Sequence, residues 1–346
     1  MRTRRLRLAA ILVSGTLLLS ACGDALGGGD SDRTSIRWAT SSVGSYGYAV
    51  ASYMVDFLNR ELDGNYVVTV HPYPSTSAAM IAAMNGEAEI AYTADVGMNE
   101  YFAREGPFAD FEPEVDELVH SFYAYPMESF LLTSADRADE LTTYADFDGA
   151  EVFFTPAGFM NWLNFQRIFE VLGYEFNHVE IDSATVADAL EGGTIVGAGG
   201  YTTAGASLPT FWREAELRVD LAPVQFTEDE LAQLEAAGME TAAVDPSVAF
   251  TQDLGTNEII GVPILFGYNL RADMDEDLVY QMLTIFEENV EDLTLLDDGF
   301  APLAEDYVGT QVGAIRTAPD IPVHPGLARF LEERDAWEDQ WTIAGE

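Results

Sequence analysis

The chain has 346 residues, of which 59 are acidic and 16 are basic, and its formal net charge is −43 at pH 7. So acidic a surface excludes a nucleic-acid-binding protein, which needs a basic face. A hydrophobic content of 48% and an aromatic content of 12% exclude a disordered chain, because they are enough to build a large core. Carboxylates at this density repel one another unless salt screens them, and at about 1 M salt the Debye length falls to about 3 Å. We therefore predict a folded, carboxylate-covered protein from a halophilic source.

The first elements in chain order are signals for export. Four arginines among the first seven residues precede the apolar segment 8–19, and Leu19-Ser20-Ala21-Cys22 follows it. This is the pattern of a secretory signal peptide with a lipoprotein processing site, while adjacent arginines also resemble a twin-arginine signal, so the export route stays open. We predict a lipoprotein-type signal peptide over 1–21, lipidation of Cys22 and a flexible tether over 22–35. Such a protein is extracytoplasmic and is attached to the outer face of the cell membrane by its lipid anchor alone.

Strands and helices alternate through the body of the chain. Alternating apolar residues and helix start and stop signals define each element. In the first part, strands are predicted over 35–40, 66–71 and 90–93, and helices over 48–62 and 75–84. In the second part, strands are predicted over 130–133, 152–154, 178–181 and 194–198, helices over 160–172 and 185–190, an extended return segment over 259–270, and a last helix over 275–292.

This alternation predicts the fold class. Strand–helix–strand patterning favours a parallel sheet with helices on both faces, and a body of this length exceeds one ordinary domain. We predict an α/β protein with two lobes, each a mainly parallel sheet flanked by helices, and a ligand in the cleft between them. Lobe 1 is assigned to 36–133 plus 267–346, and lobe 2 to 134–266.

The loops after the carboxyl ends of the strands are the candidate ligand-binding loops, because ligands of open α/β sheets bind there. One of them is the Ser/Gly/Tyr turn over 41–48. Its hydroxyls and the N–H groups of the following helix can hold a polar or anionic group, although a plain helix cap accounts for the same residues. Two lobes that present such loops to each other make a cleft that closes on a ligand.

Several motifs together resemble those of the TAXI family, the extracytoplasmic solute-binding receptors of one class of TRAP transporters. The similar motifs are the turn over 41–48, the segment 85–91 with Asp95 after it, the segment 154–158 with its helix, and the His-Pro-Gly element in 321–326. The resemblance covers nearly all of 36–334. It implies a periplasmic-binding-protein fold of type II, a small organic solute such as an organic acid or an amino-acid-like molecule, no cofactor, and TRAP membrane subunits as partners.

The sequence departs from the TAXI pattern where that family has small polar residues. Phe159, Met160 and Trp162 stand at the start of the second-lobe helix, and Tyr201 follows the second-lobe strand. These side chains either pack in the core or line the cleft, where they favour a ligand with an apolar or aromatic part. Arg167, two turns into that helix, faces either the cleft or solvent. The candidate ligand-binding residues are Ser41, Ser42, Gly44, Ser45, Tyr46, Ser75, Thr76, Asp95, Pro156, Gly158, Phe159, Met160, Asn161, Trp162, Tyr201 and Thr202.

No catalytic or metal-binding motif is recognisable. The histidines His71, His120, His178 and His324 form no i, i+4 pair. Cys22 is the only cysteine, so no thiol nucleophile remains in the body and no internal disulfide forms. We predict a protein that is not an enzyme and that holds no metal. Two alternatives stay open: a binding protein for an ABC transporter or a sensor, and a lipid-anchored hydrolase.

Overall fold

The computed structural model describes residues 33–62 and 64–346. The predicted signal peptide, the lipidation site at Cys22 and most of the predicted tether lie outside the described residues. Residues 34–346 form one compact unit. Within the described part of the chain, no helix combines the length and the apolar character that crossing a membrane requires.

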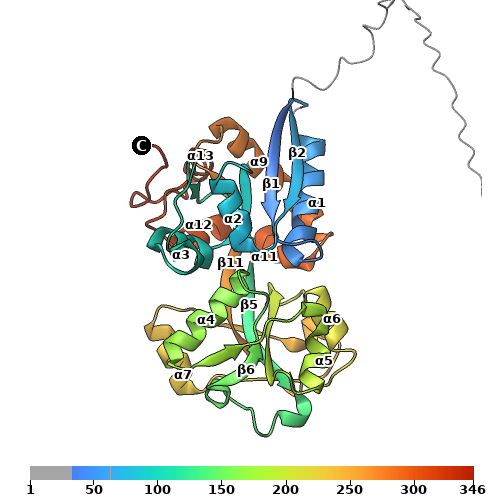
Figure 1. The fold of residues 1–346 in the computed structure, drawn as a ribbon. Coiled ribbons are helices and arrows are strands. Elements are labelled where there is room, and N and C mark those ends of the chain that lie inside the picture. The colour runs from blue at the N-terminus through green and yellow to red at the C-terminus, as the bar shows by residue number, and fades with distance from the viewer. Residues whose placement is uncertain (1–32, 63) are drawn as a thin grey trace, which may run out of the picture. The chain divides into compact units, whose positions relative to one another are not determined.

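Three parallel strands and two helices begin the first lobe (Figure 1). β1 (Thr34–Thr40) pairs with β2 (Tyr66–Pro72) on one side and with β3 (Ile90–Ala94) on the other. The intervening helices α1 (Tyr46–Glu61) and α2 (Thr76–Met84) start where a serine side chain accepts a hydrogen bond from a free N–H group of the first turn. Each helix buries one apolar face against the sheet, so the strand ends and helix starts are fixed close together.

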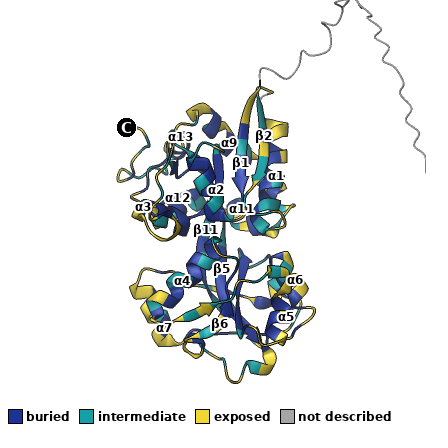
Figure 2. Cartoon of the chain, viewed as in Figure 1, coloured by how far each residue is buried: buried dark blue, intermediate teal, exposed yellow. Residues whose placement is uncertain are grey.

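The second lobe repeats this arrangement. β6 (Ala150–Phe153) pairs in parallel with β7 (Phe176–His178) and with β8 (Gly197–Thr203). Helices α4 (Met160–Leu172) and α5 (Val186–Glu191) connect these strands. Two hydrophobic clusters form this lobe's core, and Figure 2 shows its central strands as buried.

Two long strands run from one lobe into the other. β5 (Tyr123–Ser134) and β11 (Ile259–Arg271) pair antiparallel with each other, β11 continues beside β3, and β5 continues beside β8. The resulting mixed sheet has the strand order β2-β1-β3-β11-β5-β8-β6-β7. Met127 belongs to the core of the first lobe and Phe130 to a core of the second, so the chain passes between the lobes over these residues.

Prolines lie in both crossing segments. Pro126 of β5 is paired with Leu265, and Pro263 of β11 is paired with Glu128. Proline has no N–H group to donate to a sheet and is rare in central strands. Here, however, the carbonyl oxygen of Pro126 accepts from Ala204 N, and Leu265 N donates to Asp95 Oδ1, so this pair faces away from the β5–β11 ladder. Pro263 lies two residues from Leu265 and faces the same way. The two prolines are therefore accommodated without loss of a hydrogen bond between β5 and β11.

The remaining elements complete the two lobes. The C-terminal helices α9 to α13 pack on the first lobe, and α6 to α8 belong to the second (Figure 1). In the part of the chain that the structure describes, short 3-10 turns occur at Gly106–Phe108, Ala135–Arg137, Tyr144–Phe147, Ser183–Thr185 and Asp298–Phe300. The other bounds are α3 (Asp95–Ala103), β4 (Leu118–Val119), α6 (Thr210–Ala215), β9 (Leu221–Pro223), α7 (Glu228–Ala236), β10 (Ala242–Val244), α8 (Pro246–Ala249), α9 (Glu276–Glu288), α10 (Val290–Thr294), α11 (Ala301–Glu305), α12 (Tyr307–Thr317) and α13 (Pro325–Glu332).

The predicted fold class is confirmed: the protein is α/β, with two lobes built on parallel strands and a return strand between them. Three element predictions need correction. The helix expected over 275–292 is two helices, α9 and α10, because Asn289 leaves the helical conformation between them. The strand expected over 178–181 is β7 and ends at His178, and the strand expected over 194–198 is β8, which starts at Gly197. The lobe boundaries 133/134 and 266/267 stay a prediction.

Substitution of Gly267 tests the close packing of β5 and β11 where they cross between the lobes. Gly267 lies at the bulge where the β5–β11 register shifts, and a Cβ atom there would clash with the carbonyl oxygen of Phe122 and lie 2.7 Å from Tyr123 Cα. Because both obstacles are backbone, Gly267→Ala should lower the free energy of unfolding by about 2 kcal/mol or more. Gly313→Ala is the matched control, since it lies within helix α12 with open space around it and should stabilise by up to about 1 kcal/mol. Denaturant unfolding measures both, and equal effects would contradict this account of the bulge.

Candidate ligand-binding cleft

A cavity of about 530 Å³ lies between the two lobes. One wall is the turn before α1, which belongs to the first lobe. The other wall comes from the second lobe: the loop between β6 and α4, the turn before α5, the end of β8, and the start of α6. Cavities of about 300–1,000 Å³ are typical of small-molecule sites, and both walls consist mainly of loops that follow strand ends.

The first-lobe wall is a turn held in one conformation by its own hydroxyl groups. Ser45 Oγ accepts a hydrogen bond from Tyr48 N at 3.2 Å and lies 2.7 Å from Ser41 Oγ. Gly44 has a φ of +89°, which a residue with a side chain rarely adopts. The turn thereby directs the N-terminus of α1, with the partial positive charge of its free N–H groups, toward the cavity.

Three aromatic side chains, Phe159, Tyr201 and Phe211, stand on the second-lobe wall. Phe159, half-buried, immediately precedes α4, and Tyr201 stands near the end of β8. Tyr201 and Phe211 meet edge to face, with ring centroids 6.2 Å apart and an interplanar angle of 61°. Burial raises the pKa of Tyr201 above its ordinary value, so its phenol is neutral.

Thr155 is a buried polar group on this wall. Thr155 is one of the residues that line the cavity, but it is only 3% exposed. Its hydroxyl oxygen is enclosed by protein atoms and has no hydrogen-bond partner among the described residues. A buried hydroxyl without a partner is costly.

Asp297 connects the two lobes beside the cavity. Its Oδ1 atom accepts hydrogen bonds from Tyr46 OH at 2.7 Å, from Ser207 Oγ at 2.8 Å and from Gly299 N at 2.8 Å. Tyr46 belongs to the first lobe and Ser207 to the second. Burial and the neighbouring charge of Asp297 raise the pKa of Tyr46, so the phenol keeps the proton that it donates.

A second contact joins the lobes at the start of α2. The carbonyl oxygen of Gly158 accepts hydrogen bonds from Ser77 N at 3.1 Å and from Ser77 Oγ at 3.0 Å. Gly158 has a φ of +86°, and a Cβ atom there would lie 2.8 Å from Ser75 Oγ. Two separate contacts thus hold the loops of one lobe against the other.

The structure brings together fewer than half of the residues predicted from the sequence. Those that line the cavity are Ser42, Gly44, Ser45, Tyr46, Pro156, Phe159 and Tyr201. Others lie just behind it: Ser41 supports the turn through Ser45, and Ser75 and Gly158 form the contact between lobes. Their roles in binding a ligand stay predictions.

The remaining predicted residues point elsewhere. Met160 packs against Gly97 of the first lobe, and Trp162 packs against the cores of both lobes. The amide nitrogen of Asn161 lies 3.4 Å from Ser129 Oγ. Thr202 donates to the buried carboxylate of Glu128 at 2.7 Å. Thr76 is buried at the start of α2. Asp95 starts α3, where its Oδ1 accepts from Val96 N at 2.7 Å and from Leu265 N at 3.1 Å. Arg167 lines a different, smaller cavity beside Glu100.

Sequence reasoning missed nine residues of the cavity wall. The segment 182–184 could have been found, because it follows a predicted strand and precedes a predicted helix. The segment 209–214 gave no signal, since α6 is too short for its periodicity to be recognised. The missed residues are Val43, Thr155, Asp182, Ser183, Ala184, Pro209, Thr210, Phe211 and Glu214.

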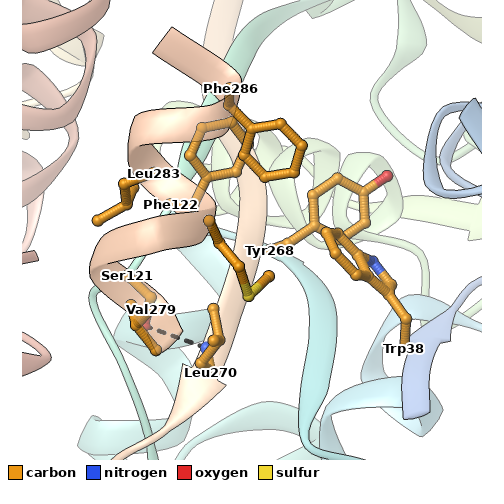
Figure 3. A pocket seen from close by; sticks show the side chains of 9 residues that line it. Trp38, Ser121, Phe122, Tyr268, Leu270, Val279, Leu283 and Phe286 are labelled. Carbon is orange, nitrogen blue, oxygen red and sulfur yellow. Dashed lines mark hydrogen bonds between the residues drawn. The ribbon is translucent and has the colours of Figure 1, made fainter. Parts of the chain in front are cut away.

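Other features of the described residues do not form a site. A void of about 10 Å³ inside the first lobe, lined by Trp38, Tyr268 and Phe286 among others, is large enough for one water molecule at most (Figure 3). Within the described ranges, no group of three His, Cys, Asp or Glu residues is placed to hold a metal ion. Burial lowers the pKa of His120 and of His324 to about 4, and His324 caps α13 by accepting from Gly326 N.

Comparisons with known proteins place the chain in a family. A family model described as the NMT1-like family matches residues 38–334. The comparison with curated proteins gives no match.

Among the solved structures that match are several of low sequence identity. A periplasmic transporter has a TM-score of 0.49 and 13% identity, covering 82% of this chain and 97% of its own. A putative L-cystine ABC transporter from Listeria monocytogenes has a TM-score of 0.46 and 14% identity, with coverages of 77% and 95%. The periplasmic aliphatic sulphonate binding protein SsuA from Escherichia coli has a TM-score of 0.45 and 15% identity, with coverages of 86% and 78%.

Thr155→Val tests the unpartnered hydroxyl. Because this change removes a buried polar group that has no partner and keeps the shape, we expect the free energy of unfolding to stay within about 0.5 kcal/mol or to rise. Thr133→Val is the matched control, since Thr133 Oγ1 donates to the carbonyl oxygen of Val196 at 2.7 Å and its loss should cost about 1 kcal/mol. Denaturant unfolding of both variants measures the difference. If Thr155→Val were as costly as Thr133→Val, the hydroxyl would already have a partner in the free protein.

Asp95→Asn tests the carboxylate at the start of α3. Burial raises the pKa of Asp95 from 3.8 to about 6, against the opposing effect of two backbone N–H groups. The folded protein therefore binds this proton more tightly than the unfolded chain, and stability falls as pH rises from about 4 to about 6. The Asn variant keeps Oδ1 as acceptor. At pH 7 its free energy of unfolding should therefore exceed that of the wild type by about 1–3 kcal/mol, and this gain should vanish near pH 4.

The control variant for Asp95→Asn should change the stability at neutral pH in the opposite direction. Hydrogen bonds from Ser247 lower the pKa of the exposed Asp245. Asp245→Asn should therefore be less stable than the wild type at neutral pH and lose that difference in acid. Urea unfolding at a series of pH values distinguishes the two, and a flat difference curve for Asp95→Asn would contradict the assigned pKa.

Proposed function

The chain belongs to the NMT1-like family, and we propose that it acts as an extracytoplasmic receptor that captures a small organic solute between its two lobes. The observation that carries the proposal is the cavity of about 530 Å³ whose walls come from both lobes. Because β5 and β11 connect the lobes at this level, a small bend in these strands opens or closes the cavity. Such a hinged cleft is the geometry of a protein that binds and releases a ligand.

The walls favour a solute with an apolar or aromatic part. Phe159, Tyr201 and Phe211 offer ring surface to the cavity, while the turn before α1 offers polar groups. An organic acid or an amino-acid-like molecule, which the TAXI resemblance implies, has an acidic group that the N-terminus of α1 suits. This function needs no cofactor, and we propose that the protein carries out no chemical reaction on its ligand.

Location and partner are part of the same proposal. The signal peptide and lipidated Cys22 attach the receptor to the outer face of the cell membrane, where its acidic surface suits a salty exterior. The partners that we propose are TRAP transporter membrane subunits, which receive the solute from the cleft. The alternative partner is an ABC transporter or a sensor, and the genes beside that of the receptor distinguish these classes.

A screen for solutes that stabilise the folded protein tests the receptor function. Thermal unfolding in about 1 M salt is measured with panels of carboxylates, amino acids, amines and aromatic acids. A ligand at about 100 times its Kd stabilises the native state by about 2.7 kcal/mol, so a true ligand raises Tm in a concentration-dependent way. Chemical conversion of the stabilising compound would instead identify an enzyme.

Phe159→Ser locates the binding site of any solute that the screen finds. Loss of an aromatic contact of about 1.5–3 kcal/mol should weaken affinity by about 10-fold to 100-fold. Phe111→Ser is the matched control, because Phe111 is equally half-buried but packs on the first-lobe core away from the cavity. The control should lower Tm and leave affinity unchanged. Unchanged affinity in Phe159→Ser would place the ligand elsewhere.

A further inference from the structure

The charges on the cavity wall have one sign. Asp182, in the turn before α5, and Glu214, in α6, line the cavity, and no Lys, Arg or His lies among the lining residues. Both side chains are exposed, and neither forms an ion pair among the described residues. Arg213 is the neighbouring cation, but its Nε donates to the carbonyl oxygen of Leu208 at 3.1 Å. A ligand in this cavity therefore meets two uncompensated negative charges.

Four aromatic side chains complete the wall. Tyr46 comes from the first lobe, and Phe159, Tyr201 and Phe211 come from the second. The face of an aromatic ring carries partial negative charge, and a cation over it is stabilised by about 0.5–2 kcal/mol. The phenol of Tyr46 also donates its proton to Asp297, which directs its hydroxyl away from a ligand and leaves the ring as the contact surface.

The opposite wall offers polar groups. Ser42 and Ser45, in the turn before α1, line the cavity across from the aromatic side chains of the second lobe. The walls thus suit a molecule that carries both a polar group and a group suited to carboxylates and aromatic faces.

From these three observations we propose that the cleft selects solutes with a positively charged nitrogen, of the alkylated ammonium class. This inference rests on the proposed receptor function and names its ligand class. Asp182 and Glu214 supply the counter-charge, the aromatic rings contact the apolar surface of the alkylated nitrogen, and the turn before α1 binds a polar group at the other end of the solute. An amino-acid-like ligand fits when it is a zwitterion, whereas a simple anion meets repulsion.

Contact, not the net charge of the whole protein, makes the selection. The formal charge of −43 attracts every cation at low salt, but at about 1 M salt charges separated by more than about 3 Å are screened. Rings and carboxylates that touch the nitrogen keep their effect. Discrimination that persists in molar salt therefore reports on the cavity wall.

Two pairs of probes of equal shape test the proposal. Choline is compared with 3,3-dimethylbutan-1-ol, and glycine betaine with 3,3-dimethylbutanoate. In each pair a neutral carbon replaces the charged nitrogen. Binding is measured by calorimetry and by thermal shift in about 1 M salt. We expect the charged nitrogen to improve affinity by about 10-fold or more within a pair, because two or more ring and carboxylate contacts act together.

Asp182→Asn tests whether this carboxylate of the cavity wall selects the charged nitrogen. The Oδ1 atom of Asp182 accepts from Ala184 N at 3.0 Å, and an asparagine keeps that bond while losing the charge. Affinity for choline and glycine betaine should fall about 3-fold to 10-fold, affinity for the neutral analogue of choline should stay the same, and affinity for the carboxylate analogue of glycine betaine should not fall. Asp253→Asn is the matched control: its Oδ1 accepts from Gly255 N at 2.9 Å in a similar turn of the same lobe, away from the cavity, and it should change neither.

The outcomes separate this inference from the receptor function. Equal or tighter binding of the carbon analogues, or binding of simple carboxylates alone, overturns the class with a charged nitrogen and leaves the receptor function standing. Failure of choline and glycine betaine together with every solute of the wider screen overturns both. Preference for the charged nitrogen that is unchanged in Asp182→Asn and in Glu214→Gln overturns the assignment of the counter-charge to these residues.

Discussion

The antiparallel pairing of β5 with β11 is the constraint on which the rest of the structure depends. These strands carry the chain between the lobes, and each continues as a member of the sheet in both. Their register therefore sets where the loops of one lobe meet those of the other. The hydrogen bond from Leu265 N to Asp95 also fastens β11 to α3 at the crossing. The connection is thus continuous as a sheet.

The cleft follows from that connection. Parallel strands on each side of the crossing end toward the other lobe, so their loops and the helices that follow them make up the walls. The first-lobe wall is shaped by serine hydroxyls and by Gly44, whereas the second-lobe wall is made of rings and carboxylates. This division gives a ligand a polar end and an apolar or charged end. It also means that neither lobe alone presents a complete binding surface.

Local sequence signals predicted much of the fold and part of the cleft. Helix α4 was predicted with its observed bounds, because an apolar stripe, an entry turn and Gly173 are all local features. The first half of β5 was missed, since the buried Glu128 interrupts its apolar pattern. Periodicity also could not tell that Phe159 faces the cavity while Trp162 packs inside. The role of Asp297 was beyond reach, because its partners Tyr46 and Ser207 lie 251 and 90 residues away in the sequence.

In the proposed receptor function, the position of Asp297 affects how tightly a solute is held. Its carboxylate bonds to both lobes through groups of the protein alone, so the protein itself contributes to the closed arrangement. The apparent Kd equals the intrinsic Kd divided by the fraction of molecules already closed. Contacts that raise this fraction therefore increase retention without touching the solute. A membrane partner that draws Tyr46 or Ser207 away from this carboxylate would lower the affinity for the solute. Docking of the protein to that partner would then trigger release of the solute.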